Sequence, residues 1–534
     1  MKKKLLCFLV ATTCAFSALL TTGCTPEDQP LAGELSIAIM EGGFGTEFLD
    51  KLIEGYKAKN PEVTIHEPEY FLGDAANDMI KSGPEDNFVD LFIAGPVFAG
   101  DLVEQGDTIY KGYDPILEDL TDVLESKAYG DDVTIEEKLY DSVASSVRYT
   151  PNLTRFPEYA KYSGKAYTLP WAYGPGGLIF NKDFFDAHPE YKIPNTTDEL
   201  IKLVQTIYDN HVAKDGLKDS EKVYPVIWAG DNASAYWRYV TAVWIAQYDG
   251  LDAWERFLRT EDENGNFTDA VFNTEGRLKA LEVLAPIIAE KNCYPNSIGT
   301  RHTDAQVQFM RGKAAMLPSG DWTENETLMS DSFGSEGADD IIMIKTPVLS
   351  ALGTKLGITD EQLSAVVSAI DAGQTSVDGI SASVFNEVKT ARSIAVNCDF
   401  NHYIAVPAYS DAKEIAKDFI KYMYSNEGMK IFMQYARGTM PCEVTLTAEE
   451  YAELSPFRKS TYDIGRTATM IAMDYTKSPI MYRNNLQLFN LGGSLVENEL
   501  GKKDNPATPA DIFADSYEFV HNRWNTYKRV AGVK

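Results

Sequence analysis

The stretch 35–45 reads LSIAIMEGGFG, a run of residues typical of a buried strand that opens into a glycine-rich turn. Apolar residues then recur at helical spacing across 48–56, and Asn60-Pro61 ends that predicted helix. Two further strands are predicted at 63–65 and 90–95. A strand–helix–strand order of this kind is typical of an α/β protein with a parallel sheet.

Later segments continue the alternation of strand and helix signals. Thr196 to Glu199 has the pattern of a capping box and predicts the start of a helix. Asn264-Gly265 predicts a turn between two edges, and 412–424 predicts an amphipathic helix. The segment 350–395 is rich in Ser, Ala and Asp and is expected to be helical.

Composition excludes several classes of protein. The chain has 534 residues, 44% of them hydrophobic and 24% charged, which is ordinary for a globular protein of about two to four domains. It carries 49 Lys plus Arg against 79 Asp plus Glu, a formal net charge of -30. Such an acidic surface repels phosphate backbones, so we do not expect nucleic acid as a partner.

The N-terminus has the features of an export signal. A basic start at 2–4 precedes an uncharged apolar run at 5–20, which is shorter than the roughly 20 residues of a membrane-spanning helix. The ending Gly23-Cys24 resembles the lipobox of bacterial lipoproteins, although Thr21 stands where that pattern prefers Leu. The resemblance implies a signal peptide at 1–23, a diacylated Cys24 and a tether at 24–33. An ordinary cleaved signal or an uncleaved anchor stays open as the alternative.

Three cysteines remain after the signal and the lipid site are set aside: Cys293, Cys398 and Cys442. They are far apart in the sequence and form no CxxC pair, so we predict neither a disulfide framework nor a zinc site. Buried free thiols are expected. We expect no metal and no cofactor.

Catalytic signatures are also missing from the sequence. Gly43 to Phe48 nearly matches a dinucleotide fingerprint, but Phe48 stands at the third glycine position. The sequence contains no GxSxG or HExxH motif. We therefore expect a protein without enzymatic activity. With 79 carboxylates a glycoside hydrolase stays open, and it would show two carboxylates facing each other across a cleft, one with a raised pKa.

Several motifs, in one order, resemble those of carbohydrate-type solute-binding proteins of bacterial ABC importers, the family 1 solute-binding proteins. They are KAYTLP at 165–170, GLIFNKDFF at 177–185, PNTTDEL at 194–200, FMRGKAAM at 309–316 with GDW at 320–322, and AKEIAKDFIKYM at 412–423 with GTMP at 438–441. The chain departs from the pattern at Thr197, where Trp is usual, and in the insertion at 350–395.

This resemblance implies an α/β, two-lobe periplasmic-binding-protein-like fold of type II, with a hinge and an interlobe ligand cleft. The first lobe would contain 34–170 and 348–440, and the second 171–347 and 441–534. The chain would cross between lobes near 171–177, after Pro347 and near Pro441. Closure of the lobes around a saccharide would present it to the permease subunits of an ABC transporter. The protein would be a monomer outside the cytoplasm, anchored to the cell membrane by its lipid.

The residues themselves favour a sugar pocket. Sugars present apolar C–H faces and polar edges, so they need flat rings beside carboxylates or amides. Trp322 is favoured most, because it follows the strand predicted at 314–317 and stands beside Gly320. Core packing is the alternative for each aromatic residue, above all for Tyr236 and Trp237, which lie in a helical run. The predicted ligand-binding residues are Glu41, Trp171, Tyr173, Trp228, Asp231, Trp237, Asp321 and Trp322.

Two further alternatives stay open. The ligand could be a peptide or another non-sugar compound. An exported adhesin or a sensor-coupled binding lobe would share the fold and the pocket but have other partners, and neighbouring permease genes would favour the importer.

Overall fold

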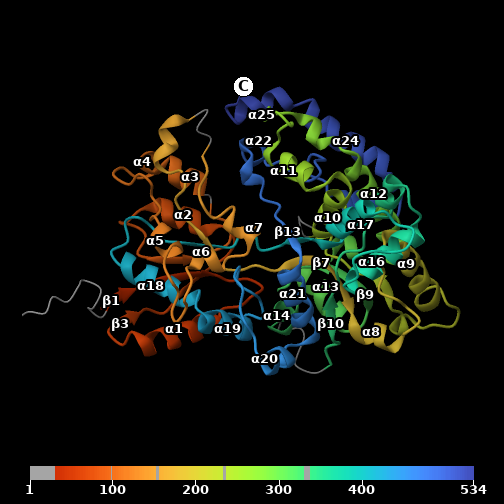
Figure 1. Cartoon of the computed structure of the whole chain (residues 1–534), viewed down its shortest axis with the longest axis horizontal. Coiled ribbons are helices and arrows are strands. Elements are labelled where there is room, and N and C mark those ends of the chain that lie inside the picture. The colour runs from red at the N-terminus through yellow and green to blue at the C-terminus, as the bar shows by residue number, and fades with distance from the viewer. Residues whose placement is uncertain (1–30, 98, 152–155, 232–235, 330–336, 534) are drawn as a thin grey trace, which may run out of the picture.

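The computed structural model describes residues 31–97, 99–151, 156–231, 236–329 and 337–533 (Figure 1). The predicted signal peptide and Cys24 lie outside these residues. The chain forms two lobes, each with helices packed around its own β-sheet. Red and orange elements with α18 and α19 form the first lobe in Figure 1, and green to blue elements form the second.

The first lobe is built on a five-stranded sheet of order β4-β2-β5-β12-β6, with β1 and β3 paired beside it. β2 runs parallel to β4 and β5, as the opening stretch predicts, whereas β12 is antiparallel to β5 and β6. The strands are β1 (Gly33–Leu35), β2 (Ile37–Met40), β3 (Val63–Ile65), β4 (Glu69–Phe71), β5 (Leu91–Ile93), β6 (Leu169–Pro170) and β12 (Tyr403–Ala405).

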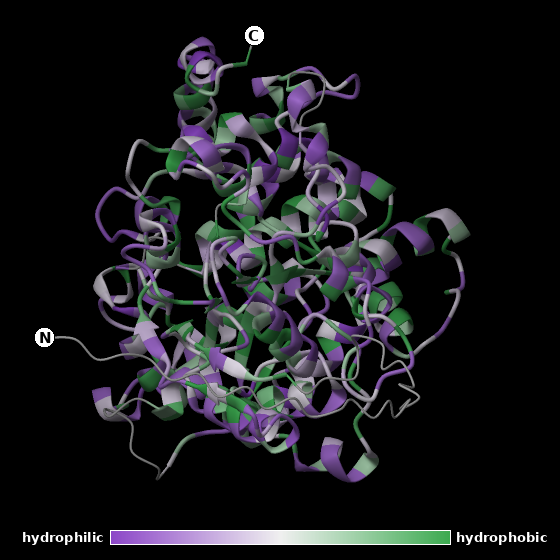
Figure 2. Cartoon of the chain, turned by 90° about the vertical axis from the view of Figure 1, so that its left-hand side faces the viewer, coloured by the Kyte–Doolittle hydropathy of each residue, from purple (hydrophilic) through white to green (hydrophobic). Residues whose placement is uncertain are grey.

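Helices cover this sheet by burying one apolar side each. α1 buries Phe48, Leu49, Leu52 and Tyr56, the spacing predicted from the sequence, and ends before Asn60. In Figure 2 the hydrophobic segments lie inside the molecule and the hydrophilic ones outside. The helices are α1 (Glu47–Lys59), α2 (Ala75–Ser82), α3 (Ala99–Glu104), α4 (Gly106–Ile109), α5 (Thr121–Leu124), α6 (Ile135–Lys138), α7 (Asp141–Ala144), η2 (Pro157–Lys161), α18 (Lys413–Met423) and α19 (Asn426–Tyr435).

The second lobe is built on a sheet of order β13-β11-β7-β9-β8, with β10 also paired to β7. This sheet is mixed and not purely parallel, because β7 runs antiparallel to β9, β10 and β11. Its strands are β7 (Pro175–Asn181), β8 (Tyr224–Val226), β9 (Ala314–Ser319), β10 (Ile341–Met343), β11 (Ile394–Asn397) and β13 (Thr469–Ile471).

One helix of the second lobe, α10, is apolar nearly all round and forms the centre of the core. It packs against α12, β11 and β7. The helices here are α8 (Lys182–Ala187), α9 (Thr197–His211), η3 (Asp219–Glu221), α10 (Trp237–Asp249), α11 (Leu251–Arg259), η4 (Asp269–Phe272), α12 (Glu275–Ile287), η5 (Glu290–Asn292), η6 (Ser297–Gly299), α13 (His302–Met310), α14 (Thr323–Met329), α15 (Ser350–Leu356), α16 (Asp360–Asp371), α17 (Ala382–Ser393), α21 (Pro456–Thr467), η7 (Tyr475–Lys477), α22 (Pro479–Arg483), α23 (Val496–Gly501), α24 (Pro509–His521) and α25 (Trp524–Val530); α20 (Ala448–Glu453) follows the last crossing.

The insertion belongs to the second lobe. The predicted boundaries place 348–397 in the first lobe, but β11 pairs with β7 and β13. The preceding helices α15, α16 and α17 form a small core of their own, and α15 and α17 pack on α10. The difference arises because the insertion continues the second sheet before the chain crosses, at 398–402 and not directly after Pro347.

Three crossing segments connect the lobes, and backbone hydrogen bonds hold them together. The amide of Trp171 donates to the carbonyl of His402 at 3.2 Å, and that of Cys398 donates to Gly174 at 2.9 Å. The amide of Tyr173 donates to Thr439 at 2.9 Å. The hinge is therefore a hydrogen-bonded ribbon that joins 171–174 to both of the other crossings.

Local predictions are confirmed with one change. Thr196 caps α9 by accepting from the amide of Glu199, but the Glu199 carboxylate accepts from Asn195, one residue earlier than in a capping box. Gly265 adopts a φ of +77° in the predicted turn. Cys293, Cys398 and Cys442 are buried free thiols. Among the described helices, none combines the length and apolar character that a membrane crossing needs.

Candidate functional site

The two lobes meet where the loop after β2 touches the start of α14. The Asn325 side-chain amide donates to the carbonyl of Gly43 at 3.0 Å, and Glu324 pairs with Arg437 at 3.4 Å. A Cβ on Gly43 would lie 2.8 Å from the Trp322 side chain. Glycine is therefore needed at this position because the loop of the first lobe lies directly on that ring.

Trp322 is the centre of an aromatic wall at this junction. It follows β9 and is partly exposed, packs against two hydrophobic clusters, and lies against Gly43 of the first lobe. Its ring centroid lies 5.8 Å from that of Tyr236 and 6.3 Å from that of Tyr239, both edge-to-face. Open α/β sheets bind ligands at the carboxyl ends of their strands, which is where Trp322 stands.

Charged and hydroxyl groups lie beside this wall. The guanidinium of Arg238 lies 5.3 Å from the centroid of the Tyr239 ring. Burial raises the pKa of Glu497 to about 7, and the positive charge of Arg238 opposes that rise. On the first lobe, burial raises the pKa of Tyr403, and the Asp474 carboxylate of the second lobe raises it further. Tyr239, Arg238 and Glu497 thus place a ring, a cation and a carboxyl together near Trp322, a combination that suits a sugar.

The predicted site residues divide into two groups. Glu41, at the start of the loop after β2, is exposed, and Trp322 is partly exposed. Asp231 is exposed and precedes the undescribed residues 232–235. The others are less than 4% exposed and lie inside the protein: Trp171, Tyr173, Trp228, Trp237 and Asp321.

Burial corrects the prediction for three aromatic residues. The indole N–H of Trp171 donates to the Ala94 carbonyl at 2.7 Å, and its ring packs in the first core. The indole N–H of Trp228 donates to the Cys293 sulfur at 3.4 Å. Tyr173 stacks on Tyr140 with centroids 4.9 Å apart. All three have their faces covered by protein, so in this conformation they support the site and do not contact a ligand.

The structure also exchanges the roles of Tyr236 and Trp237. Trp237 is the first residue of α10 and is fully buried in the second core. Tyr236 has a left-handed backbone, with φ of 52°, and its ring turns toward Trp322 and stacks on Tyr239 at 5.8 Å. The sequence analysis selected Trp237. The left-handed backbone of Tyr236 at the start of α10 turns the Tyr236 ring toward the junction instead, and the sequence does not show this conformation.

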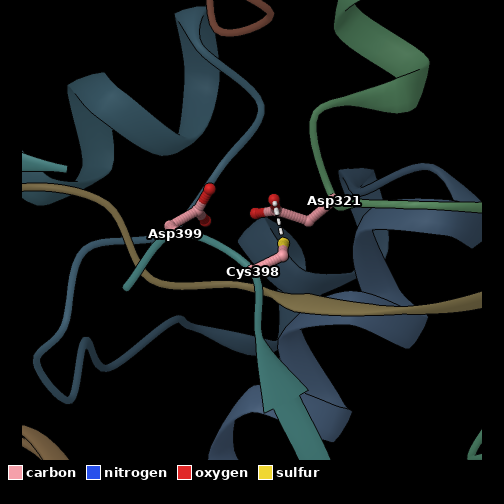
Figure 3. Close-up of side chains that lie close together, drawn as sticks. All are labelled: Asp321, Cys398 and Asp399. Carbon is pink, nitrogen blue, oxygen red and sulfur yellow. Dashed lines mark hydrogen bonds between the residues drawn. The ribbon is translucent and has the colours of Figure 1, made fainter. Parts of the chain in front are cut away.

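Asp321 belongs to a buried group at the hinge (Figure 3). Burial raises its pKa to about 7 and raises that of Asp399 well above its usual range, and the two carboxyls interact directly. The Cys398 thiol donates to Asp321 at 3.6 Å. Sequence reasoning missed Asp399, Tyr239 and Tyr403, because the sequence does not show which residues flank the crossings.

Two hollows lie away from the junction. One, of about 150 Å³, lies between the insertion and β10, and the other, of about 310 Å³, lies beside α3 and η2 on the first lobe. Neither contains a predicted site residue.

Two α/β lobes, three hydrogen-bonded crossings and an aromatic junction define the class of two-lobe binding proteins. The family model described as bacterial extracellular solute-binding protein matches residues 51–455, about three quarters of the chain. The chain belongs to this family.

A curated relative and several solved structures agree with this assignment. The multiple sugar-binding protein of Streptococcus mutans is 28% identical over 162 residues, which are 30% of this chain and 35% of that protein. The matched stretch thus spans about a third of the relative's length.

The solved structures extend the similarity over nearly the whole chain. RafE from Streptococcus pneumoniae in its apo form is 17% identical with a TM-score of 0.54, covering 92% of this chain and 99% of that one. A Listeria monocytogenes substrate-binding protein in complex with cycloalternan is 16% identical with a TM-score of 0.54, covering 94% and 99%. Maltose-bound MalE3 from T. maritima is 14% identical with a TM-score of 0.56, covering 92% and 99%. At these identities the likeness shows the fold, which is the predicted two-lobe one.

Proposed function

We propose that this protein captures a carbohydrate, an oligosaccharide in particular, between its lobes and delivers it to an ABC transporter. The observation that carries the proposal is the position of Trp322. Its partly exposed ring lies at the lobe junction, with Gly43 of the first lobe on one side and Tyr236 of the second lobe nearby. A ligand stacked there touches both lobes, so its binding energy favours the closed arrangement. Proteins of similar fold that bind raffinose, maltose and cycloalternan support a sugar.

The test is a thermal-shift screen across oligosaccharides of increasing length. A ligand at about 100 times its Kd adds ~2.7 kcal/mol to the free energy of unfolding. We expect at least one saccharide to raise the melting temperature, with peptides and monovalent salts as controls. A shift with a peptide and with no saccharide would assign the site to the non-sugar alternative.

The proposal includes the location and the partners. The family is extracellular by description, and the predicted lipid on Cys24 would hold the protein at the outer side of the cell membrane. The permease subunits would recognise the closed form of a monomer. The net charge of -30 supports the exclusion of nucleic acid as a partner.

A glycoside hydrolase is the second function to weigh, because Asp321 and Asp399 are neighbouring carboxyls with raised pKa values. Their geometry does not suit it. A retaining glycosidase needs its two carboxyls at about 5 to 5.5 Å on either side of a bound sugar. Asp321 is 3% exposed and Asp399 is 0% exposed, and side chains of the hinge surround both. We therefore propose binding without hydrolysis.

A further inference from the structure

A buried group of three side chains lies at the hinge, next to the Tyr239 ring: a Cβ on Gly176 would lie 2.8 Å from that ring and 2.9 Å from Cys398. Asp321 follows β9, and Cys398 and Asp399 begin the second crossing segment. One ligating atom of each lies within 4.8 Å of the others. Figure 3 shows the two carboxyl groups facing each other, with the Cys398 thiol beside Asp321.

Asp399 points to a missing positive charge. Its side chain is 0% exposed, and apart from the neighbouring Asp321 carboxyl no group among the described residues donates a hydrogen bond to its carboxylate oxygens. His402 Nδ1 lies 3.5 Å from Asp399 Oδ1 and 3.3 Å from the backbone carbonyl oxygen of the same residue, so the ring contacts Asp399 at its edge. In the described part of the chain no Lys or Arg forms an ion pair with Asp321 or Asp399. Two buried carboxyls this close together either share a proton or hold a cation between them.

We propose that Asp321, Cys398 and Asp399 bind a divalent transition-metal cation of the zinc type. A thiolate beside carboxylates favours a borderline-soft ion such as Zn²⁺ over Ca²⁺ or Mg²⁺, which take oxygen ligands. Zinc–sulfur and zinc–oxygen bonds at the tetrahedral angle place the two donor atoms about 3.6 Å apart. Cys398 Sγ and Asp321 Oδ1 are separated by 3.6 Å.

The backbone offers a fourth donor. The carbonyl oxygen of Gly174, on the first crossing segment, lies 3.3 Å from Cys398 Sγ. A Cβ on Gly174 would lie 1.9 Å from Asp321 Oδ2, so only glycine lets this carbonyl approach the carboxylate. His402 contacts only Asp399 of the group and holds that carboxylate from outside.

A cation here would add a side-chain link to the backbone hydrogen bonds that already join the crossings. It links the first crossing through Gly174, the second through Cys398 and Asp399, and the second lobe through Asp321. Metal binding would therefore stiffen the hinge about which the lobes close. The spacing of the cysteines predicted no zinc site because the partners of Cys398 are carboxylates, one of them 77 residues away in the sequence.

The test uses the exported protein with Cys24, Cys293 and Cys442 changed to Ser, so that Cys398 is the single thiol. After treatment with a chelator it is titrated with Co²⁺, and Zn²⁺ is then added in competition. We expect one equivalent of Co²⁺ with a thiolate-to-cobalt absorption band in the near ultraviolet, displaced by Zn²⁺. Adding Cys398→Ser should abolish the band, and Asp399→Asn should weaken binding by at least ~100-fold.

Because the other cysteines have been replaced by Ser, only Cys398 can produce a thiolate band. The result can therefore be interpreted even if the Cys398→Ser variant does not fold. Failure to take up one equivalent of cobalt, uptake without that band, or equal affinity in Asp399→Asn would overturn the proposal. The last two outcomes would mean that the carboxyls share a proton and that cobalt binds elsewhere. Saccharide binding is measured separately on the metal-free protein, so failure of the metal proposal would leave the carbohydrate proposal standing.

Discussion

Replacing Trp322 by Ala separates ligand binding from stability. The ring provides the only large apolar face that is both partly exposed and in contact with the two lobes among the predicted tryptophans described above. Losing a central aromatic anchor costs at least ~2 kcal/mol of binding free energy, a roughly thirtyfold rise in Kd.

The cost in stability should be smaller than for a core residue. Trp322 loses two edge-to-face contacts, with Tyr236 and Tyr239, and contacts of this kind contribute about 0.5 to 1.5 kcal/mol each. We therefore expect a loss of about 1 to 3 kcal/mol in the free energy of unfolding. Trp254 is a matched control, since it is 2% exposed and its indole N–H donates to Ala472 at 3.1 Å. Trp254→Ala should cost ~3 to 5 kcal/mol of stability.

The assays are calorimetric titration with the best saccharide from the thermal-shift screen and thermal melting of both variants. Weak binding by Trp322→Ala with a smaller drop in melting temperature than Trp254→Ala supports a stacking platform. Trp322→Phe should lie between the wild type and Trp322→Ala in affinity. An unchanged affinity, or a melt as impaired as that of Trp254→Ala, would refute the reasoning.

Three further predictions concern the anchor, the chemistry and pH. Cys24→Ser should release the protein from membranes on cell fractionation, and a variant that stays fully membrane-bound would rule out the lipoprotein. No saccharide that binds should be hydrolysed; product formed in proportion to protein and abolished by Asp399→Asn would move the protein to the hydrolases. Because the folded pKa of Glu497 is about 7, above its unfolded value, its contribution to stability falls as pH rises from about 4.3 to 7. Melting temperatures should show that Glu497→Gln removes this fall, worth up to ~3 kcal/mol, and an identical pH profile would contradict it.

The sequence was informative where one local pattern determined one element. The apolar spacing of Phe48, Leu52 and Tyr56 predicted α1, and the stretch at 35–45 predicted a parallel strand and its turn. The sequence did not predict which lobe contains the insertion, because the periodicity of its helices would be the same in either lobe. Only the pairing of β11 with β7 assigns 348–397 to the second sheet.

The site was harder to predict because it depends on which side chains face the junction in the folded protein. Trp322 was selected from its place after a strand, a signal that is independent of tertiary contacts, and its role in ligand binding stays a prediction. Trp171 and Trp228 stand in similar positions, but their indole N–H groups are bonded inside the lobes. Asp399 carries no motif, and its partner Asp321 comes near only because the second crossing passes the end of β9.

The central claim is that one saccharide is held by both lobes at once. Hydrogen exchange measured by mass spectrometry, with and without saturating saccharide, tests it most directly. We predict simultaneous protection of the loop at 41–45 in the first lobe and of 236–239 and 320–325 in the second. Protection confined to a single lobe, or centred on the hollow beside the insertion, would contradict capture between the lobes.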